Sequence, residues 1–457
     1  MMERYDLIVI GAGSAARDAA GKAARDYGAE VAMVERTRWG GSCPNVACQP
    51  TKAYLVAAEL VHDLNTLAQT VGINVGPATA DLARVKARKD SLRRTQESWV
   101  EVLQGAGIET VMGEATFVDA QTIRVGGRTL SAPRILIGTG SRTAVPPIPG
   151  IAEIDWIGHV SALELTELPE SMLVIGGGAV GLEFGQAFSR FGSKVTIVDA
   201  LDQIAPRSEP QAAAELQAAL EDEGIEVILS SLVSRLRREG DGVVAEIGDR
   251  ERRVDKVLLS AGRVPNVEEL GLERIGVETT RSGIVVNERL RTSVDGVWAA
   301  GDVTGLAQFT PIAQYQARVA VEDMFGTNGA AADYSYLPTA IFTDPELAGL
   351  GLTEQEAIEQ GLDVDTAVKE LTNVTRAKFL GARHGLYKLV FEQQSRRVVG
   401  VHVVSRGASD VVQSLALALR YGATIEDFAR VHHTYPSYGE GLKAAAERAL
   451  AKEPASA

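Results

Sequence analysis

The sequence predicts an α/β protein with two doubly wound units followed by a separate α+β module. Two observations support the doubly wound units, because the apolar strands at 5–10 and 172–175 each run into a glycine-rich turn, a helix and a second strand. The third observation is a change of character beyond residue 336, where alternating strands mix with helices. We expect the main elements of this last module at 353–360, 387–391, 398–404 and 408–421.

Composition limits the functional classes. A chain of 457 residues is too long for one core, so several domains are expected. A formal charge of −14 argues against nucleic acid or an anionic membrane surface as partner. No apolar run reaches membrane-spanning length, and no signal peptide precedes the first strand. With only two cysteines, the sequence favours a reducing, cytoplasmic location.

The first glycine-rich turn matches a dinucleotide-binding fingerprint. The strand ends at Gly11-Ala12-Gly13-Ser14-Ala15-Ala16, and the second strand ends on Glu35, 24 residues after Gly11. Gly11 makes the turn, and Gly13 lets the backbone approach a pyrophosphate at the helix N-terminus. Ala16 fills the third small position. We therefore expect Gly11, Gly13, Ala16 and Glu35 to bind one dinucleotide.

The second turn repeats the fingerprint. Gly176, Gly178 and Gly181 follow a strand, and the next strand ends on Asp199, 23 residues after Gly176. An acid at this place suits a ribose 2′-hydroxyl and repels a 2′-phosphate, and no arginine follows it directly. The sequence thus favours NADH, although Arg207 further along the loop leaves NADPH open.

Further strands close on glycine turns at 138–141, 261–266 and 300–303, and a proline-rich run at 145–150 is typical of a linker. Asp302 follows the last of these strands, at the carboxyl end where α/β proteins bind ligands. We expect four segments: a first part of one dinucleotide-binding domain at 1–148, a second dinucleotide-binding domain at 149–270, a second part of the first domain at 271–335 and the C-terminal module at 336–457.

The only two cysteines, Cys43 and Cys48, are five positions apart. In a regular helix their Cα atoms would be about 8–9 Å apart, whereas a disulfide needs about 4.4–6.8 Å. A bridge therefore requires a distorted backbone and would be labile. We expect Pro44 to open a helix with Cys43 at its cap, and Pro50 to kink the chain that follows. Spacing alone leaves open two buried cysteines without chemistry.

Together these motifs resemble the flavoprotein disulfide reductases, the family of dihydrolipoamide dehydrogenase, glutathione reductase and mercuric reductase. The resemblance implies FAD, NADH or NADPH as co-substrate, a small-molecule substrate, and a homodimer in which the C-terminal domain completes the partner's active site. It implies that Cys48 contacts the flavin, Cys43 attacks or binds the substrate, and Lys52 lies near the flavin, paired with Glu183. No resident metal is expected. The implied FAD residues are Gly11, Gly13, Ala16, Glu35, Gly41, Ser42, Lys52, Ala115, Thr139, Gly140, Ser141, Asp302, Thr310 and Pro311, and the implied NAD residues are Gly176, Gly178, Gly181, Glu183, Asp199 and Gly262.

The C-terminal sequence departs from the disulfide-reducing members, which end in a His-Pro-Thr-x-x-Glu pattern. Here Tyr435 replaces the catalytic histidine and Glu440 keeps the glutamate position. A tyrosine with a pKa of about 10 is a poor base at neutral pH. His433 lies two residues upstream, displaced by about 6.6 Å if the backbone is extended. The tyrosine most resembles mercuric reductase, where no leaving thiol needs a proton.

Three functions follow. The leading hypothesis is a mercuric-reductase-like enzyme that reduces a metal ion, an electrophile or a disulfide at Cys43 and Cys48. The alternatives are dihydrolipoamide dehydrogenase or another low-molecular-weight disulfide reductase, and a non-catalytic FAD/NAD-binding redox sensor. The first strand begins at residue 5 and residues 452–457 contain no cysteine pair, so we do not expect a complete mercury-detoxifying role.

Overall fold

The computed structural model of the protein describes residues 2–327, 329 and 331–451, and the chain divides into two compact units. The first unit comprises Met1–Pro50, Lys89–Ala144 and Gly262–Asp333. The second unit comprises Thr51–Arg88, Val145–Ala261 and Tyr334–Ala457. Each unit is therefore assembled from three segments that are distant in the sequence.

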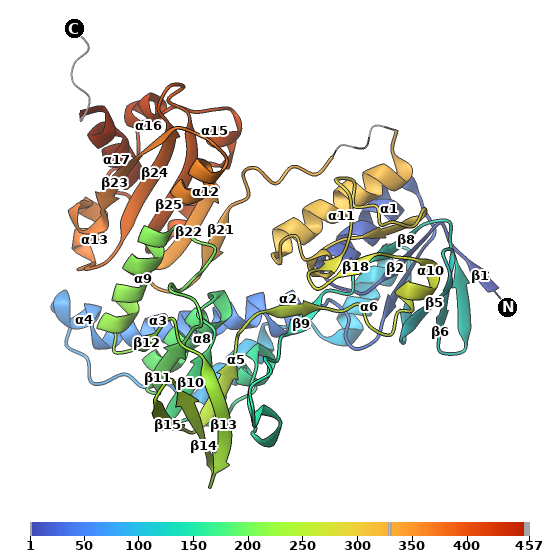
Figure 1. The fold of residues 1–457 in the computed structure, drawn as a ribbon, viewed down its shortest axis with the longest axis horizontal. Coiled ribbons are helices and arrows are strands. Elements are labelled where there is room, and N and C mark those ends of the chain that lie inside the picture. Colours follow the sequence, from blue (N-terminus) through green and yellow to red (C-terminus); the bar gives the residue numbers. More distant parts are fainter. Residues whose placement is uncertain (1, 328, 330, 452–457) are drawn as a thin grey trace. The chain divides into compact units, whose positions relative to one another are not determined.

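The first unit is built on a five-stranded parallel sheet with the order β20-β8-β2-β3-β4. All four residues of the central strand β2 are buried, as expected for a strand covered on both faces. Helices α1 and α11 pack together against the sheet (Figure 1). The elements are β2 (Leu7–Ile10), β3 (Val31–Glu35), β4 (Ile108–Met112), β8 (Ile135–Ile137), β20 (Val297–Ala299), α1 (Ser14–Tyr27), α6 (Gln96–Gly105) and α11 (Thr310–Phe325).

Helix α1 packs closely because its buried face consists of alanines. Ala15, Ala16, Ala19, Ala20 and Ala23 are the buried residues of this helix. Their spacing places them along one helical face, and their small side chains allow a close approach to the neighbouring elements. A smaller four-stranded sheet completes this unit in the order β1 (Met2–Arg4), β7 (Arg128–Ser131), β6 (Thr122–Val125) and β5 (Ala115–Asp119).

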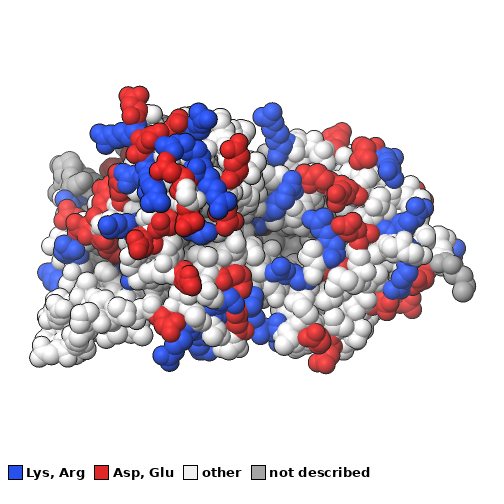
Figure 2. All heavy atoms as spheres, turned by 90° about the horizontal axis from the view of Figure 1, so that it is seen from below, with Lys and Arg blue, Asp and Glu red and all other residues white. Residues whose placement is uncertain are grey.

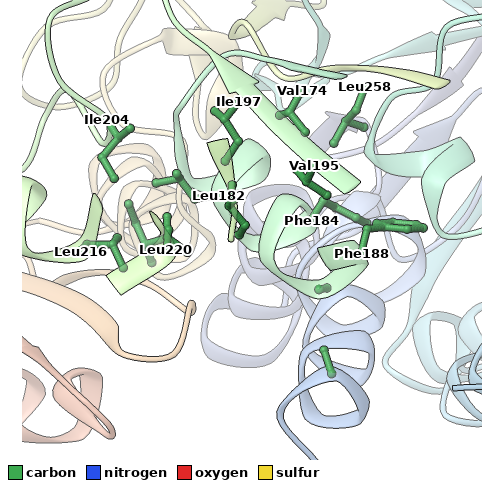
Figure 3. Close-up of a cluster of buried hydrophobic side chains, with 14 of the residues drawn as sticks. Val174, Leu182, Phe184, Phe188, Val195, Ile197, Ile204, Leu216, Leu220 and Leu258 are labelled. Atoms are coloured by element: carbon green, nitrogen blue, oxygen red, sulfur yellow. The ribbon is translucent and has the colours of Figure 1, made fainter. Parts of the chain in front are cut away.

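The second unit contains a four-stranded parallel sheet with the order β12-β11-β10-β16. Helix α8 packs on this sheet through two phenylalanines, Phe184 and Phe188, whose ring centroids are 6.3 Å apart (Figure 3). The elements are β10 (Ser171–Ile175), β11 (Lys194–Val198), β12 (Glu226–Ile228), β16 (Lys256–Leu259), α8 (Ala179–Phe191) and α9 (Pro210–Asp222).

The same unit contains a five-stranded antiparallel sheet with the order β21-β22-β25-β24-β23. Every residue of β25 is buried, and helix α17 belongs to the apolar core on this sheet. The predicted helix at 408–421 is divided into α14 and α15. The elements are β21 (Thr339–Ile341), β22 (Glu346–Gly351), β23 (Val364–Glu370), β24 (Leu386–Glu392), β25 (Val398–Ser405), α12 (Glu354–Glu359), α14 (Ala408–Gln413), α15 (Ala416–Arg420) and α17 (Glu440–Ala451).

The predicted α/β class with a C-terminal α+β module is confirmed by these sheets. None of the helices within 2–327, 329 and 331–451 has the length and apolar character required of a membrane span. On the face drawn in Figure 2, acidic and basic side chains of the described residues are interspersed. That face shows no extended basic surface of the kind that binds nucleic acid.

Candidate active site

A groove of about 570 Å³ lies in the first unit at the carboxyl ends of its parallel strands. It is the place where α/β sheets bind dinucleotides. The structure brings nine predicted FAD residues into its wall, whereas Lys52 belongs to the second unit. These nine are Gly11, Gly13, Glu35, Gly41, Ser42, Ala115, Thr139, Gly140 and Ser141.

Two glycines of the groove cannot be replaced without rearrangement. Gly11 has φ +110°, and a Cβ there would lie 2.3 Å from the carbonyl oxygen of Gly138. Gly41 has φ +71°, and its Cβ would lie 2.3 Å from Cα of Gly13. Gly13 is the N-cap of α1 and provides no side-chain cap, so the helix N-terminus can receive an anion. The wall therefore fits a dinucleotide pyrophosphate.

Glu35 ends β3 on the groove wall. Its Oε1 accepts hydrogen bonds from the backbone N–H of Thr37 at 2.8 Å, the Thr37 hydroxyl at 2.9 Å and the backbone N–H of Arg38 at 3.2 Å. All three bonds go to one carboxylate oxygen and fix the orientation of the side chain. This arrangement suits an acid that holds a ribose hydroxyl.

Asp302 is held by a residue that sequence reasoning did not include. The Ser141 hydroxyl donates to Oδ2 of Asp302 at 2.5 Å, and Nε of Arg263 donates to the Ser141 hydroxyl at 2.7 Å. Arg263 also forms an ion pair with Asp302 at 3.5 Å. Gly262, which was predicted to bind NAD, lies in the first unit and directly precedes Arg263. This neighbouring glycine was the only feature of the sequence that pointed to Arg263.

Cys43 and Cys48 belong to two successive helices. Helix α2 (Ser42–Val46) is followed by Ala47, whose φ and ψ of −133° and −106° are not helical, and α3 (Cys48–Asn65) begins at the next residue. This break is the distorted backbone that a bridge between the two cysteines would require. The positions predicted for the prolines are wrong. Pro44 is the third residue of α2, and Pro50 lies in the first turn of α3, where its missing N–H costs no hydrogen bond.

The two cysteines are free thiols, with Cys43 partly buried and Cys48 exposed. They contact each other, and the hydrogen bond to Cys48 is the largest of the effects that raise the pKa of the Cys43 thiol. Desolvation raises this pKa further, while Thr310 and Arg17 lower it. Sγ of Cys48 is 3.6 Å from the Thr310 hydroxyl. Thr310, predicted to contact FAD, thus lies against both sulfurs.

In the second unit, Lys52 and Glu183 form the predicted pair. Nζ of Lys52 donates to Oε1 and Oε2 of Glu183 at 2.9 and 2.7 Å. Phe342 was not predicted. Its backbone N–H donates to Oε1 of Glu183 at 3.0 Å, and its ring centroid is 4.3 Å from Nζ of Lys52. The ring and the buried carboxylate together restrict the lysine side chain.

The second glycine turn also needs its glycines. Gly176 has φ +110°, and a Cβ there would lie 2.5 Å from the carbonyl oxygen of Ser260. A Cβ at Gly181 would lie 2.0 Å from the carbonyl oxygen of Gly176. Gly178 is the N-cap of α8. Asp199 lies at the same turn, because its carboxylate accepts from the backbone N–H of Gly177 at 2.6 Å.

The C-terminal residues are placed at the start of α17. Tyr435 is 72 % exposed, and its hydroxyl donates to the Thr375 hydroxyl at 3.4 Å. Glu440 accepts from the backbone N–H of Ser437. Desolvation is the main cause of the lowered pKa of His433, and the charge of Glu440 opposes it. Residues 452–457, where the sequence has no cysteine pair, lie outside the described residues.

The fold and this site define a class of two-dinucleotide flavoenzymes with a dithiol, and comparison with known proteins agrees. The chain belongs to the pyridine nucleotide-disulphide oxidoreductase family, whose model matches residues 5–317. The dimerisation domain of the same family matches residues 337–446. Members are FAD-dependent enzymes that use NAD(P)H, so the predicted enzyme class is confirmed.

Relatives come from two branches. The chain is 38 % identical to mercuric reductase of Staphylococcus aureus over 97 % of this chain and 82 % of the relative. It is 36 % identical to dihydrolipoyl dehydrogenase of Geobacillus stearothermophilus over 97 % and 96 %. A solved structure, the Cu(II) complex of the HOCl-induced flavoprotein disulfide reductase RclA from Escherichia coli, matches with a TM-score of 0.88 and 28 % identity, covering 98 % of this chain and 100 % of that one.

Proposed function

We propose that the protein uses NADH to reduce a small thiol-reactive acceptor through the dithiol of Cys43 and Cys48. The observation that carries the proposal is the contact between these two thiols at the break between α2 and α3. Gly41 and Ser42, immediately before Cys43, line the dinucleotide groove. A redox pair thus adjoins a groove whose glycines fit FAD.

FAD bound in the groove would supply a two-electron carrier between the reduced nicotinamide and a disulfide of Cys43 and Cys48. The groove residues around Gly11, Gly41 and Glu35 would hold its pyrophosphate and ribose. Lys52 and Glu183 would orient the reacting end, because Glu183 and Phe342 hold the ammonium group in one place. We assign these residues to cofactor binding and positioning.

Membership of the family supports a division of labour between the two thiols. We assign binding of the acceptor to Cys43. We assign to Cys48 the regeneration of the Cys43 thiol after the acceptor has reacted. A thiolate is the reactive form of either residue. The hydrogen bond between the two sulfurs raises the pKa of the Cys43 thiol, so the reactive thiolate of Cys43 forms at a higher pH than it would without this contact.

The acceptor is proposed to be a metal ion, another electrophile or a disulfide. Tyr435 supports the first two, because it is a poor base and a metal ion or electrophile bound by thiolates has no thiol to expel. The name mercuric reductase among the relatives and the Cu(II) complex of RclA support the same choice. The family assignment favours this enzymatic role over a non-catalytic redox sensor.

The second candidate is dihydrolipoamide dehydrogenase or a related disulfide reductase. It is supported by the similar identity to dihydrolipoyl dehydrogenases and by Glu440, which keeps the family position. In either case we propose a homodimer in which Tyr435 and Glu440 complete the site of a second copy, with the four segments 1–148, 149–270, 271–335 and 336–457 as domains. Asp199 supports NADH as the preferred nucleotide.

The experiment is a panel of acceptors assayed with NADH and with NADPH. Mercuric and cupric ions, lipoamide and small disulfides would each be tested with the unmodified protein and with Cys43→Ser. We expect turnover of at least one acceptor that Cys43→Ser abolishes while flavin reduction by NADH persists. Turnover that survives Cys43→Ser for every acceptor would exclude the dithiol as the outlet for electrons.

A further inference from the structure

The loop that follows β11 closes on the second glycine turn. Asp199 begins this loop, and its carboxylate accepts from the backbone N–H of Gly177 at 2.6 Å. Further along, the backbone N–H of Ala205 donates to the carbonyl oxygen of the same Gly177 at 2.8 Å. Ile204 is fully buried in the apolar core that also includes side chains of α9 (Figure 3). Residues 199–209, here called the nucleotide loop, are therefore tied to the glycine turn from two of their residues.

The nucleotide loop ends at Glu209, which binds a distant part of the chain. Glu209 is the N-cap of α9, yet its carboxylate makes no capping hydrogen bond. A polar side chain at this position commonly accepts from the first turn of its own helix. Here Oε1 accepts from Nζ of Lys388 at 2.7 Å, 179 positions away, and Oε2 accepts from the backbone N–H of Glu354 at 3.0 Å. Both partners belong to the C-terminal module.

The Glu209–Lys388 pair is buried and well partnered. The side chains of Glu209 and Lys388 are 3 % and 4 % exposed. Nζ of Lys388 has a second carboxylate partner, Oε2 of Glu354, at 2.5 Å. Burial by itself would raise the pKa of Glu209, but the hydrogen bonds from Lys388 and from the backbone of Glu354 bring this pKa below its ordinary value. Because removal of one partner would leave an uncompensated buried charge, the pair fixes the end of the nucleotide loop.

Helix α9 is attached to the C-terminal module along its whole length. It packs against β22, β24 and β25. Glu215 accepts from the backbone N–H of Gly385 at 2.7 Å, and Oδ2 of Asp222 lies 2.7 Å from Nε2 of His384. Asp222 is the last residue of the helix, about 18 Å from its first residue at 1.5 Å per residue. The contact of Asp222 therefore holds the helix alone, whereas that of Glu209 also holds the nucleotide loop.

We infer that Lys388 and Glu209 are positioning residues for the reduced nicotinamide nucleotide, because their pair holds the nucleotide loop in the conformation that presents Asp199. The inference deepens the proposed function and rests on it, since it takes the second glycine turn as the NADH site. Without the pair, the loop has to be ordered when the nucleotide binds, and this ordering lowers the affinity. The C-terminal module thus contributes to nucleotide binding through a lysine that is assigned no contact with the nucleotide.

The test is anaerobic stopped-flow reduction of the flavin at increasing NADH concentrations. It separates the apparent Kd for NADH from the limiting rate of flavin reduction, and it needs no acceptor. The variants are Glu209→Gln, Lys388→Met, the double variant and Lys388→Arg. Asp222→Asn is the matched control, because it removes an acid that joins the same helix to the same module. Flavin content and denaturant unfolding show whether each variant is folded and how far its stability changes.

We expect Glu209→Gln and Lys388→Met each to raise the apparent Kd for NADH by about tenfold, the size of one charge-assisted hydrogen bond, and to leave the limiting rate within about twofold. The double variant should show less than the summed effect, because both changes remove one contact. Lys388→Arg should recover part of the affinity. Asp222→Asn should leave the apparent Kd within about twofold, whatever its effect on stability.

Lower stability with an unchanged apparent Kd in Glu209→Gln would mean that the pair is structural only. An equal rise of Kd in Asp222→Asn would mean that any loosening of α9 weakens binding. Either result overturns the inference. If Lys388→Met does not fold, Glu209→Gln decides, since it keeps the shape of the side chain. The proposed dithiol outlet fails separately, through Cys43→Ser, because flavin reduction by NADH does not involve the acceptor. If NADH does not reduce the flavin of the unmodified protein, the proposed function fails and the inference with it.

Discussion

Nζ of Lys52 lies 2.9 and 2.7 Å from the two carboxylate oxygens of Glu183, which is 131 positions away in the sequence. Glu183 is only 5 % exposed, and Phe342 supplies a third hydrogen bond to it. These hydrogen bonds offset the free-energy cost of burying the Glu183 carboxylate. Because the buried carboxylate cannot exchange the lysine for water, it holds the ammonium group of Lys52 in place. This pair links the helix that carries Cys48 to the helix that follows the second glycine turn.

Glu183→Gln removes the negative charge and keeps the shape. We expect flavin reduction by NADH to slow by about tenfold, and the free energy of unfolding to fall by about 1–3 kcal/mol, because the lysine loses a charge-assisted hydrogen bond. Stopped-flow absorbance and denaturant unfolding measure the two effects. Glu322→Gln is the matched control, since Glu322 pairs with Lys22 at 2.7 Å on the exposed surface. It should change stability by less than about 1 kcal/mol and leave the rate unaltered.

Cys43→Ser and Cys48→Ser should separate the two roles of the thiols. We expect Cys43→Ser to lose acceptor turnover while keeping flavin reduction by NADH, because the acceptor-binding sulfur is gone. In the unmodified protein, anaerobic titration with NADH should produce a long-wavelength absorption band from the Cys48 thiolate beside the flavin. Cys48→Ser should lack that band. A band that persists in Cys48→Ser would show that Cys48 is not the cysteine that contacts the flavin.

Thr310→Val should shift the pH dependence of acceptor reduction. The hydrogen bond to Cys48 and burial both raise the pKa of Cys43, and Thr310 opposes them. Because the thiolate is reactive, the rate rises with pH through the pKa of Cys43, and removing the Thr310 hydroxyl moves this rise to higher pH. The pH profile of single-turnover acceptor reduction measures the shift. Thr310→Ser keeps the hydroxyl and should show no shift, and a shift of Thr310→Val to lower pH would contradict this role.

Tyr435→His tests the missing base. A histidine with its ordinary pKa near 6.5 can accept a proton at neutral pH, whereas a tyrosine near 10 cannot. We expect at least a tenfold gain in the turnover of lipoamide or small disulfides, and none for metal ions, which expel no thiol. His433→Ala serves as the control for the nearby histidine. Unchanged disulfide turnover in Tyr435→His would count against Tyr435 as the reason for poor disulfide exchange.

Asp199→Ala tests the choice of nucleotide. The carboxylate accepts from the backbone N–H of Gly177 at 2.6 Å and from that of Leu201 at 2.9 Å, so it is fixed at the end of β11. We expect kcat/KM for NADH to fall by about tenfold, because the hydrogen bond that a ribose hydroxyl donates to the carboxylate is lost. The ratio of NADH to NADPH activity should fall with it. Asp202→Ala, in the same loop, is the control. An unchanged ratio would show that Asp199 only holds the loop.

Several features could be predicted from neighbouring residues because local chemistry determines them. The turns at Gly11 and Gly176 need a positive φ, and a strand, a glycine turn and an acid at a fixed distance specify a parallel unit without knowledge of the rest. The spacing of Cys43 and Cys48 likewise indicated that a bridge between them would need a break in the helix, and such a break occurs at Ala47. The proline positions were predicted wrongly, because the first turn of a helix tolerates proline at more than its first residue.

The sequence by itself determined the two dinucleotide units, the dithiol and the family, since each depends on residues that are close together in the chain. Only the tertiary structure decided that Phe342 holds Lys52, that Arg263 holds Ser141 next to Asp302, and that Lys388 binds Glu209 at the end of the nucleotide loop. The physical reason is that these contacts join segments up to 290 positions apart. Such contacts form only when distant segments pack together in the folded chain, so no periodicity or spacing in the sequence predicts them.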